Sequence, residues 1–426
     1  MKQIIYLWFP LLFAWFALNL EEVIYIPIAA SLGNIKDNLA AFNLAYSLVL
    51  LCESFLYPVL SGSNVFSSNK QKSKKFFKFT LSLALFFAAV ILLCSTAAVS
   101  EFIFQKTMKL NFEITKLAAA SLLIMSITPI LVGYRRFFQG ILIGHEKSKF
   151  ITASSIARLL TIIFTSFILA KFIHEGALIV SLGMISGMFV DALISRIACR
   201  EFLKSMPQEK FAGNNKQGFK HLLYFYLPLG VSSMVLYLSL PIMNFFASYG
   251  AYPVESIASL GAVTAFMYLL KSFGVSFQEA VITIYNKSSQ HNSDLKRVMY
   301  YIFSLTLIVS LIVCFSKLIN LYLYNASGLT VELTEFSIFP IQLLFFVPSL
   351  TVLISYFKGI FIKIQQTKVI FISAIIEIAS LSIVLTIGLY FANYPAIQKM
   401  AIAIVISNFC VSGYLFFAKR ALEAAA

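Results

Sequence analysis

PILVGYRRFFQGILIGHEKSKFITASSIAR, residues 129–158, recurs 219 residues later as PSLTVLISYFKGIFIKIQQTKVIFISAIIE, residues 348–377. The two copies share residues at equivalent positions: Pro129 and Pro348, Phe138 and Phe357, Gly140 and Gly359, and Lys149 and Lys368. Both copies are apolar over a length that spans a bilayer. A repeat of this kind predicts that one helical membrane unit occurs twice in the chain.

The two copies differ mainly in charge. The substituted positions are Arg136 opposite Ser355, Gln139 opposite Lys358, and Arg158 opposite Glu377. A charged side chain at the centre of a bilayer costs roughly 3 kcal/mol even on insertion scales, so such residues usually serve a function. Arg135 and Arg136 are therefore the first candidates for a binding site. Alternatively, either side chain reaches the headgroups from its helix and acts as an anchor.

The composition indicates the fold class. The 426 residues are 60% hydrophobic and only 12% charged, which is typical of an all-α polytopic membrane protein. We expect twelve transmembrane helices in two pseudo-symmetric six-helix bundles. Their approximate ranges are 4–30, 38–61, 76–98, 115–143, 150–172, 176–198, 222–248, 253–284, 298–322, 333–362, 368–392 and 396–418. No metal-ligand spacing is visible among the five cysteines, and no cofactor is expected.

The distribution of basic residues predicts the orientation in the membrane. If the N-terminus is inside, the cytoplasmic segments hold 19 of the 33 lysines and arginines, and the external loops hold six. This bias predicts a cytoplasmic (inner) membrane location with both termini in the cytoplasm. It also accounts for the net charge of +15 through topology and anionic lipid headgroups. Nucleic acid is therefore not an expected partner, and we expect a monomer.

One long polar stretch divides the chain. We expect an N-terminal bundle over residues 1–205, a cytoplasmic linker over 206–217 and a C-terminal bundle over 218–420. Six helices in each half make the repeats parallel, and the substrate path of such folds lies between the halves. The terminal ALEAAA, residues 421–426, resembles a cloning remnant and is left out of the functional interpretation.

Further polar residues fall inside the expected helices. Asn43, Tyr46 and Glu53 share one helical face by their spacing. Lys271 is equivalent to Glu53 and lies on a face that also carries Gln278, so the two halves present opposite charges. Glu53 and Lys271 either line a cavity or form a structural ion pair. The secondary candidates are Arg158, Asp191, Gln278 and Glu377, with the alternative that Asp191 pairs with Arg196.

NLAAFNLAYSLVLL (38–51), SGSNVFSSNKQK (61–72), YLPLG (226–230) and RRFFQG (135–140) resemble the progressive ankylosis (ANK) membrane transporters. More broadly, the chain is similar to the multidrug/oligosaccharidyl-lipid/polysaccharide (MOP) exporter superfamily, which includes MATE antiporters and MurJ-type flippases. The resemblance implies alternating access through a central cavity. It also implies binding roles for Glu22, Asn43 and Tyr46. The acidic residues that some MATE transporters carry in the second half have no match, because Lys271 is found there instead.

Three functions remain open from the sequence. The first is a secondary transporter or exporter of a small anionic or amphipathic solute, which suits the cations Arg135, Arg136, Lys271 and Lys358. The second is a flippase of a polyprenyl-pyrophosphate-linked sugar, because a pyrophosphate binds to Arg and Lys. The third is a cation-coupled multidrug antiporter. An enzyme is not expected, and Glu22 and Glu53 are the candidate carboxylates for Na⁺ or H⁺ coupling.

Overall fold

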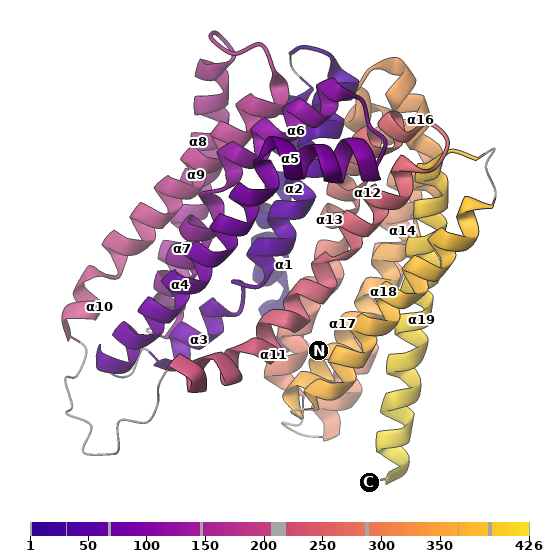
Figure 1. Cartoon of the computed structure of the whole chain (residues 1–426). Coiled ribbons are helices and arrows are strands. Elements are labelled where there is room, and N and C mark those ends of the chain that lie inside the picture. Colours follow the sequence, from indigo (N-terminus) through magenta and orange to yellow (C-terminus); the bar gives the residue numbers. More distant parts are fainter. Residues whose placement is uncertain are drawn as a thin grey trace. The chain divides into compact units, whose positions relative to one another are not determined.

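The computed structural model of the chain is almost entirely helical (Figure 1). It describes residues 2–30, 32–66, 70–144, 148–205, 219–285, 289–364, 366–390 and 394–425. In this part of the chain, nine helices are long and apolar enough to span a membrane. Counting one bent pair as a single span raises this number to ten. The prediction of an all-α, multi-pass membrane protein is therefore confirmed.

Ten of the twelve expected spans coincide with these helices. The bent pair, α16 (Val331–Leu343) and α17 (Val347–Lys363), bends by 45° and corresponds to the expected span 333–362. The two remaining expected spans, 4–30 and 222–248, fall on α1 (Lys2–Ala29) and on α11 (Phe219–Tyr237) with α12 (Ser239–Ser248). Not every residue of these helices is described.

The contacts between helices group the chain into two compact units. One unit comprises Leu32–Pro241 and is called unit N; the other comprises Met1–Ser31 with Ile242–Ala426 and is called unit C. Unit N contains α2 (Ile35–Ser54), α3 (Val59–Phe66), α4 (Lys70–Ser95), α5 (Ala97–Ser100), η1 (Glu101–Thr107), α6 (Phe112–Met125), α7 (Thr128–Gly144), α8 (Ser148–Leu169), α9 (Gly176–Ala198), α10 (Arg200–Ser205) and α11. Unit C contains α1, most of α12, α13 (Pro253–Ile284), α14 (Ser289–Phe315), α15 (Leu318–Asn320), η2 (Leu321–Ala326), α16, α17, α18 (Thr367–Leu389) and α19 (Ala396–Ala425).

The first helix of each sequence half packs with the unit built from the other half. In unit C, Trp8 of α1 donates its indole hydrogen to the Ser276 hydroxyl oxygen of α13 at 2.9 Å. In unit N, Tyr226 of α11 lies between aromatic rings of the α2–α3 connection and α4. The division into residues 1–205 and 218–420 stays a prediction, and the contact grouping differs from it in the position of these two helices.

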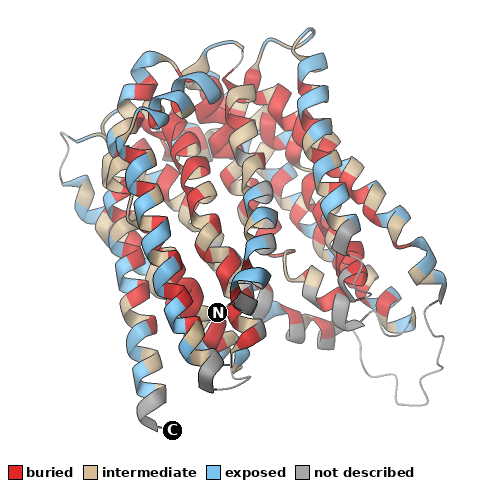
Figure 2. Cartoon of the chain, turned by 180° about the vertical axis from the view of Figure 1, so that it is seen from behind, coloured by how far each residue is buried: buried red, intermediate tan, exposed pale blue. Residues whose placement is uncertain are grey.

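Within each unit, buried residues line the helix faces that contact other helices, and exposed residues lie on the remaining faces (Figure 2). Large apolar side chains dominate the exposed faces, for example Phe164 in α8 and Ile312 in α14. In water such faces would favour aggregation, whereas in lipid they match the surroundings. The exposure pattern therefore agrees with helices that contact a bilayer.

The repeat is visible in the backbone hydrogen bonds of the two units. Each unit has a short π-helix, η1 or η2, followed by a turn with a residue of positive φ, Lys109 (55°) or Gly328 (67°). The amide-to-carbonyl bonds that close the two turns differ by 219 in residue number: Met108 to Ile103 and Leu110 to Phe104 in unit N, and Ser327 to Tyr322 and Leu329 to Leu323 in unit C. The predicted register of 219 is thus present in the structure.

The shared glycines of the repeat make equivalent helix contacts. A β-carbon on Gly140 of α7 would lie 2.2 Å from the carbonyl oxygen of Leu60 in α3. A β-carbon on Gly359 of α17 would lie 3.1 Å from the carbonyl oxygen of Gln278 in α13, which is equivalent to Leu60 at the offset of 218. Glycine at both positions allows two helix backbones to approach closely, a common packing mode in membranes.

Candidate functional site: a buried ionic cluster in unit N

Small residues bring α8 and α9 together and determine where the site forms. Gly183 and Gly187 form a G-x-x-x-G pair on one face of α9. A β-carbon on Gly187 would lie 2.9 Å from the carbonyl oxygen of Arg158 in α8, so the two backbones are close here. Asp191 and Ser195 continue the same face at steps of four residues. The sequence therefore directs the Asp191 carboxylate towards the turn of α8 that carries Arg158.

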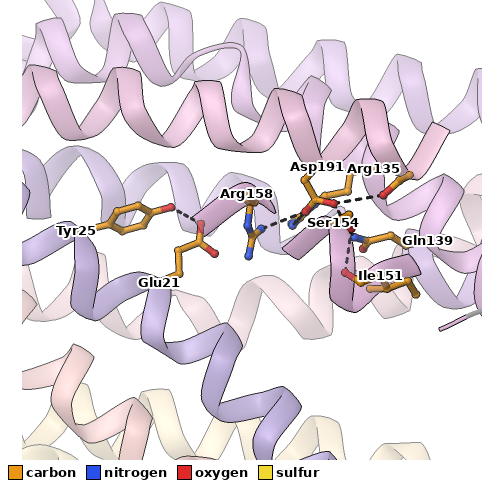
Figure 3. Close-up of polar contacts among 9 residues, drawn as sticks. Glu21, Tyr25, Arg135, Gln139, Ile151, Ser154, Arg158 and Asp191 are labelled. Carbon is orange, nitrogen blue, oxygen red and sulfur yellow. Dashed lines mark hydrogen bonds and ion pairs between the residues drawn. The ribbon is translucent and has the colours of Figure 1, made fainter. Parts of the chain in front are cut away.

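The Asp191 carboxylate is the centre of the site. Arg135 Nη1 of α7 donates a hydrogen bond of 2.8 Å to Asp191 Oδ2, and Arg158 Nη1 lies 3.7 Å from the same oxygen. The exposed fractions of the three side chains are 8% for Arg135, 4% for Arg158 and 0% for Asp191. Figure 3 shows the two guanidinium groups converging on this carboxylate from different helices. We call Arg135, Arg158 and Asp191 the ionic cluster.

Neutral donors complete the coordination of Asp191. Gln139 Nε2 lies 3.4 Å from Asp191 Oδ1 (Figure 3), and the Ser195 hydroxyl lies 3.3 Å from the same oxygen. Ser154 of α8 donates its hydroxyl hydrogen to the Ile151 carbonyl oxygen at 2.9 Å, next to the cluster (Figure 3). Buried charges are tolerated when such bonds surround them. The sequence analysis did not select Gln139, Ser154 or Ser195 as site residues. Gln139 follows Arg135 by four residues, and Ser195 follows Asp191 by four residues. This spacing places each of them on the same helical face as a charged candidate and could have identified them from the sequence.

The cluster carries more positive than negative charge. Two guanidinium groups share one carboxylate. Arg136, the neighbour of Arg135 in α7, lies within electrostatic range of both Arg135 and Arg158. The Arg136 guanidinium is 5.1 Å from the ring centre of Tyr57, a cation–π distance. Consecutive residues of a helix point about 100° apart, which explains why Arg135 contacts Asp191 and Arg136 contacts Tyr57. The three charged residues of the cluster thus carry one more positive than negative charge, and the buried carboxylate of Glu53 lies in the same neighbourhood, around Tyr57.

Unit C has no copy of this cluster at the equivalent positions. The register of 219 places Ile354 opposite Arg135, Glu377 opposite Arg158 and Cys410 opposite Asp191. Two of the three positions thus lack a charge, and the third has the opposite charge. The asymmetry shows that the helical packing of the repeat does not require these ions. A specific role in unit N is the simplest explanation for them.

Asp191 does not pair with Arg196 as the alternative interpretation proposed. The Arg196 guanidinium lies 5.1 Å from the ring centre of Phe138, and the Arg196 side chain is exposed. Residues five apart in a helix point about 140° away from each other, so Arg196 is directed away from the face of Asp191. That alternative was wrong, whereas the selection of Arg135, Arg158 and Asp191 as candidates identified residues that the structure brings together.

The remaining candidates of unit N lie on α2. Asn43 and Glu53 are buried, and Tyr46 is half-buried with its ring stacked on Phe42 at 5.4 Å. Helix α2 ends at Ser54. The chain resumes as α3 at Val59, after Pro58, so the expected span 38–61 is broken into two helices. Glu53 therefore lies at the end of α2, next to the break. Tyr57, whose ring contacts Arg136, lies within the break between α2 and α3.

The candidates of unit C lie on three different helices, α13, α17 and α18. Lys271 of α13 lies over the Tyr268 ring at 5.5 Å, and Gln278 lies on the same helix beside Gly359. Lys358 of α17 and Glu377 of α18 are half-buried. The side chain of Glu22, in α1, falls outside the described part. The approach of Glu53 to Lys271 involves both units and stays a prediction.

Comparison with known proteins gives one partial family match and several structural matches. Residues 63–254 match the family model described as "Polysaccharide biosynthesis protein", and this segment contains the whole ionic cluster. No curated protein sequence matches the chain. The family match covers less than half of the residues.

Solved transporter structures share the fold. An inward-facing multidrug resistance MATE family transporter of the MOP superfamily matches with a TM-score of 0.75 and 14% identity, over 96% of this chain and 95% of that chain. A MOP superfamily transporter from Pyrococcus furiosus Vc1 matches with a TM-score of 0.66 and 14% identity, over 100% and 96%. The lipid II flippase MurJ in an inward closed conformation matches with a TM-score of 0.69 and 20% identity, over 97% and 87%. The predicted two-bundle, MATE-like fold is thereby confirmed, and the relationship to ANK transporters stays a prediction.

Proposed function

We propose that the protein is a MOP-type membrane transporter that moves a solute carrying an anionic group by alternating access. The observation that carries this proposal is the net positive charge of the ionic cluster, in which Arg135 and Arg158 share the Asp191 carboxylate. Guanidinium groups bind carboxylates and phosphates through two parallel hydrogen bonds. An incoming anion would compete with Asp191 for these donors. We expect no enzymatic activity and no resident cofactor.

The similar structures support transport in general and leave the substrate open. The Pyrococcus furiosus Vc1 protein is described as having a binding pocket of reverse polarity that suggests a different function. Pocket polarity can therefore separate functions within this fold. In the present chain, buried arginines occupy unit N, which favours an anion over the organic cations of a drug antiporter. Coupling to Na⁺ or H⁺ through Glu22 or Glu53 remains part of the proposal.

The sharpest test is a proteoliposome efflux assay with paired substrates. Purified protein is reconstituted, and efflux of labelled citrate, a nucleotide and inorganic pyrophosphate is compared with efflux of ethidium under imposed Na⁺ and H⁺ gradients. We expect efflux of at least one anion above protein-free vesicles and no efflux of ethidium. Ethidium efflux without anion efflux would overturn the proposal. If anion efflux is lost when either the Na⁺ gradient or the H⁺ gradient is left out, that ion is the coupling ion.

Variants connect the assay to the cluster. Arg158→Lys keeps the charge and loses the paired geometry, so the KM for the anion should rise by about tenfold, the equivalent of roughly 1.4 kcal/mol. Arg196→Lys is the matched control, because Arg196 is exposed and contacts a ring instead of Asp191. If Arg158→Lys and Arg196→Lys have equal KM values at equal protein level, the ionic cluster does not belong to the substrate-binding site.

A second candidate function is the flipping of a polyprenyl-pyrophosphate-linked sugar. The family match to polysaccharide biosynthesis proteins over residues 63–254 favours it, as does the fold of the MurJ flippase. A fluorescent polyprenyl-pyrophosphate sugar in vesicles, with a membrane-impermeant quencher outside, measures this activity. Quenching that depends on the protein and fails in Arg158→Lys would favour the flippase over the small-anion exporter.

A further inference from the structure

Arg136 lies in an aromatic corner of unit N, beside the ionic cluster. Its guanidinium is 5.1 Å from the ring centre of Tyr57, which lies in the break between α2 and α3. The Tyr57 ring meets the Tyr237 ring of α11 edge to face, with 5.4 Å between the ring centres and 84° between the planes. Three separate segments of unit N therefore place one guanidinium group beside two tyrosines.

The polar groups of Arg136 and Tyr57 are not used within the described part of the chain. Arg136 Nε is buried and has no hydrogen-bond partner there. No hydrogen bond or ion pair joins the Arg136 guanidinium or the Tyr57 hydroxyl to a described residue. Both side chains are half-buried, so a ligand can reach part of each. A charge inside a membrane protein is costly without hydrogen bonds, and a bound anion would supply the missing acceptors.

The charge of Arg136 is compensated less than the charges of the ionic cluster. Arg136 lies within electrostatic range of Arg135 and Arg158, which already share the one carboxylate of the cluster. The buried carboxylate of Glu53 lies within electrostatic range of Tyr57. In the described part of the chain, no carboxylate lies within 4 Å of the Arg136 guanidinium. Three neighbouring guanidinium groups repel one another, so an anion at Arg136 would be stabilising.

The repeat indicates that helix packing does not require Arg136 and Tyr57. The register of 219 places Ser355 opposite Arg136, and the offset of 218 places Val275 opposite Tyr57. Unit C nevertheless keeps an extensive contact between α13 and α17, the helices that carry these two residues. A binding role is therefore a better explanation for the arginine and the tyrosine of unit N than a packing role.

We propose that Arg136 and Tyr57 form a second anion subsite, and that the transported solute carries two anionic groups. This inference rests on the proposed function. One group of the solute binds to Arg158, and the other accepts hydrogen bonds from the Arg136 guanidinium and the Tyr57 hydroxyl. Arg135 and Arg136 are consecutive in α7, so the two anionic groups must lie close together in the solute. Dicarboxylates and pyrophosphates have this chemistry.

Calorimetric titration of the purified full-length protein in detergent tests the subsite with matched anions. The pairs are pyrophosphate with orthophosphate and glutarate with butyrate, which distinguish phosphate from carboxylate groups. For at least one pair, we expect the anion with two groups to bind about tenfold more tightly than the anion with one group.

Variants assign this preference to the subsite. Arg136→Gln should weaken binding of the two-group anion about tenfold. Binding of the one-group anion should weaken only about twofold, because it loses a long-range attraction and no direct contact. Tyr57→Phe removes one donor and should weaken binding of the two-group anion about fivefold. Arg136→Lys keeps the charge, loses the paired geometry and should also reduce the preference, which provides a second test of this position.

Two matched variants control for the loss of a cation–π contact and for the loss of a hydroxyl group. Arg196→Gln removes a guanidinium that lies over the Phe138 ring, also at 5.1 Å. Tyr134→Phe removes a hydroxyl group in α7 from a ring that contacts the Phe77 and Phe138 rings. Neither control should change the preference for the two-group anion.

The outcomes separate this inference from the proposed function. If no anion binds, both are overturned. If anions bind and the two members of each pair bind equally, the protein still recognises anions and the second subsite is overturned. The same conclusion follows if Arg136→Gln and Arg136→Lys keep the preference seen in Arg196→Gln, or if Tyr57→Phe keeps the preference seen in Tyr134→Phe.

Discussion

Gly140 lies against Leu60 so closely that a β-carbon at residue 140 would be 2.2 Å from the Leu60 carbonyl oxygen. The same β-carbon would be 1.8 Å from the Ser63 hydroxyl oxygen. At the equivalent contact of unit C, a β-carbon on Gly359 would be 2.9 Å from the Val281 side chain. The two contacts are homologous by the repeat, and the first is the tighter of the two.

Gly140→Ala should therefore destabilise the protein more than Gly359→Ala. At Gly140 the Leu60 carbonyl oxygen would have to move by about 1 Å to reach an ordinary contact distance, whereas at Gly359 the nearest atoms, Cβ and Cγ1 of Val281, are already 2.9 Å away and need a smaller shift. Overpacking of this kind costs about 1–3 kcal/mol, and Gly140→Ala should lie at the upper end. Thermal unfolding in detergent measures the difference, with Gly413→Ala as the control in open space. If Gly140→Ala and Gly359→Ala lower the unfolding temperature equally, the closer backbone contact at Gly140 does not determine the loss of stability.

Tyr226→Phe should weaken the connection between α2 and α3. The Phe55 carbonyl oxygen lies at the break before Pro58, and Tyr226 of α11 donates a hydrogen bond of 2.7 Å to it. Loss of the hydroxyl leaves a buried carbonyl unsatisfied, which costs about 1–3 kcal/mol. The melting temperature of the purified protein measures this loss. Tyr301→Phe, at a side chain that is 66% exposed, is the control and should leave the melting temperature unchanged.

The elements predicted from sequence are those that depend on local patterns. Apolar length located the helices, and identities such as Gly140 with Gly359 gave the register, because the same close contact selects glycine twice. The break between α2 and α3 was not predicted. Pro58 signals a disturbance there, but the residue that satisfies the free carbonyl, Tyr226, is 171 residues away in the chain. The pairing of Asp191 with Arg135 was missed for the same reason.

The orientation in the membrane is a separate prediction of the charge distribution. A cysteine introduced at Lys210, in the polar linker, should react with a membrane-impermeant maleimide only after the membrane is opened. Labelling of Lys210→Cys in intact cells would reverse the predicted topology. Lys171→Cys provides the opposite control, because Lys171 belongs to a loop that is predicted to be external.

A double-mutant cycle on the ionic cluster measures how far Asp191 and Arg135 depend on each other. Asp191→Leu leaves buried guanidinium groups without the shared carboxylate, and Arg135→Leu removes the closest partner of that carboxylate. Breaking a buried pair from one side costs about 3–5 kcal/mol, whereas replacing both partners with apolar residues is often close to neutral.

The double variant Arg135→Leu with Asp191→Leu still leaves the buried Arg158 without the Asp191 carboxylate, so it should remain less stable than the original protein. Because it leaves one guanidinium in the cluster and not two, it should be more stable than Asp191→Leu alone, by about 2 kcal/mol in chemical unfolding. The repeat supports this expectation, because unit C has Ile354 and Cys410 at the two positions. If the double variant is stable and inactive in anion efflux, the cluster serves binding and not folding. If it is stable and still transports the anion, Arg135 and Asp191 are structural, and the substrate site lies elsewhere in the chain.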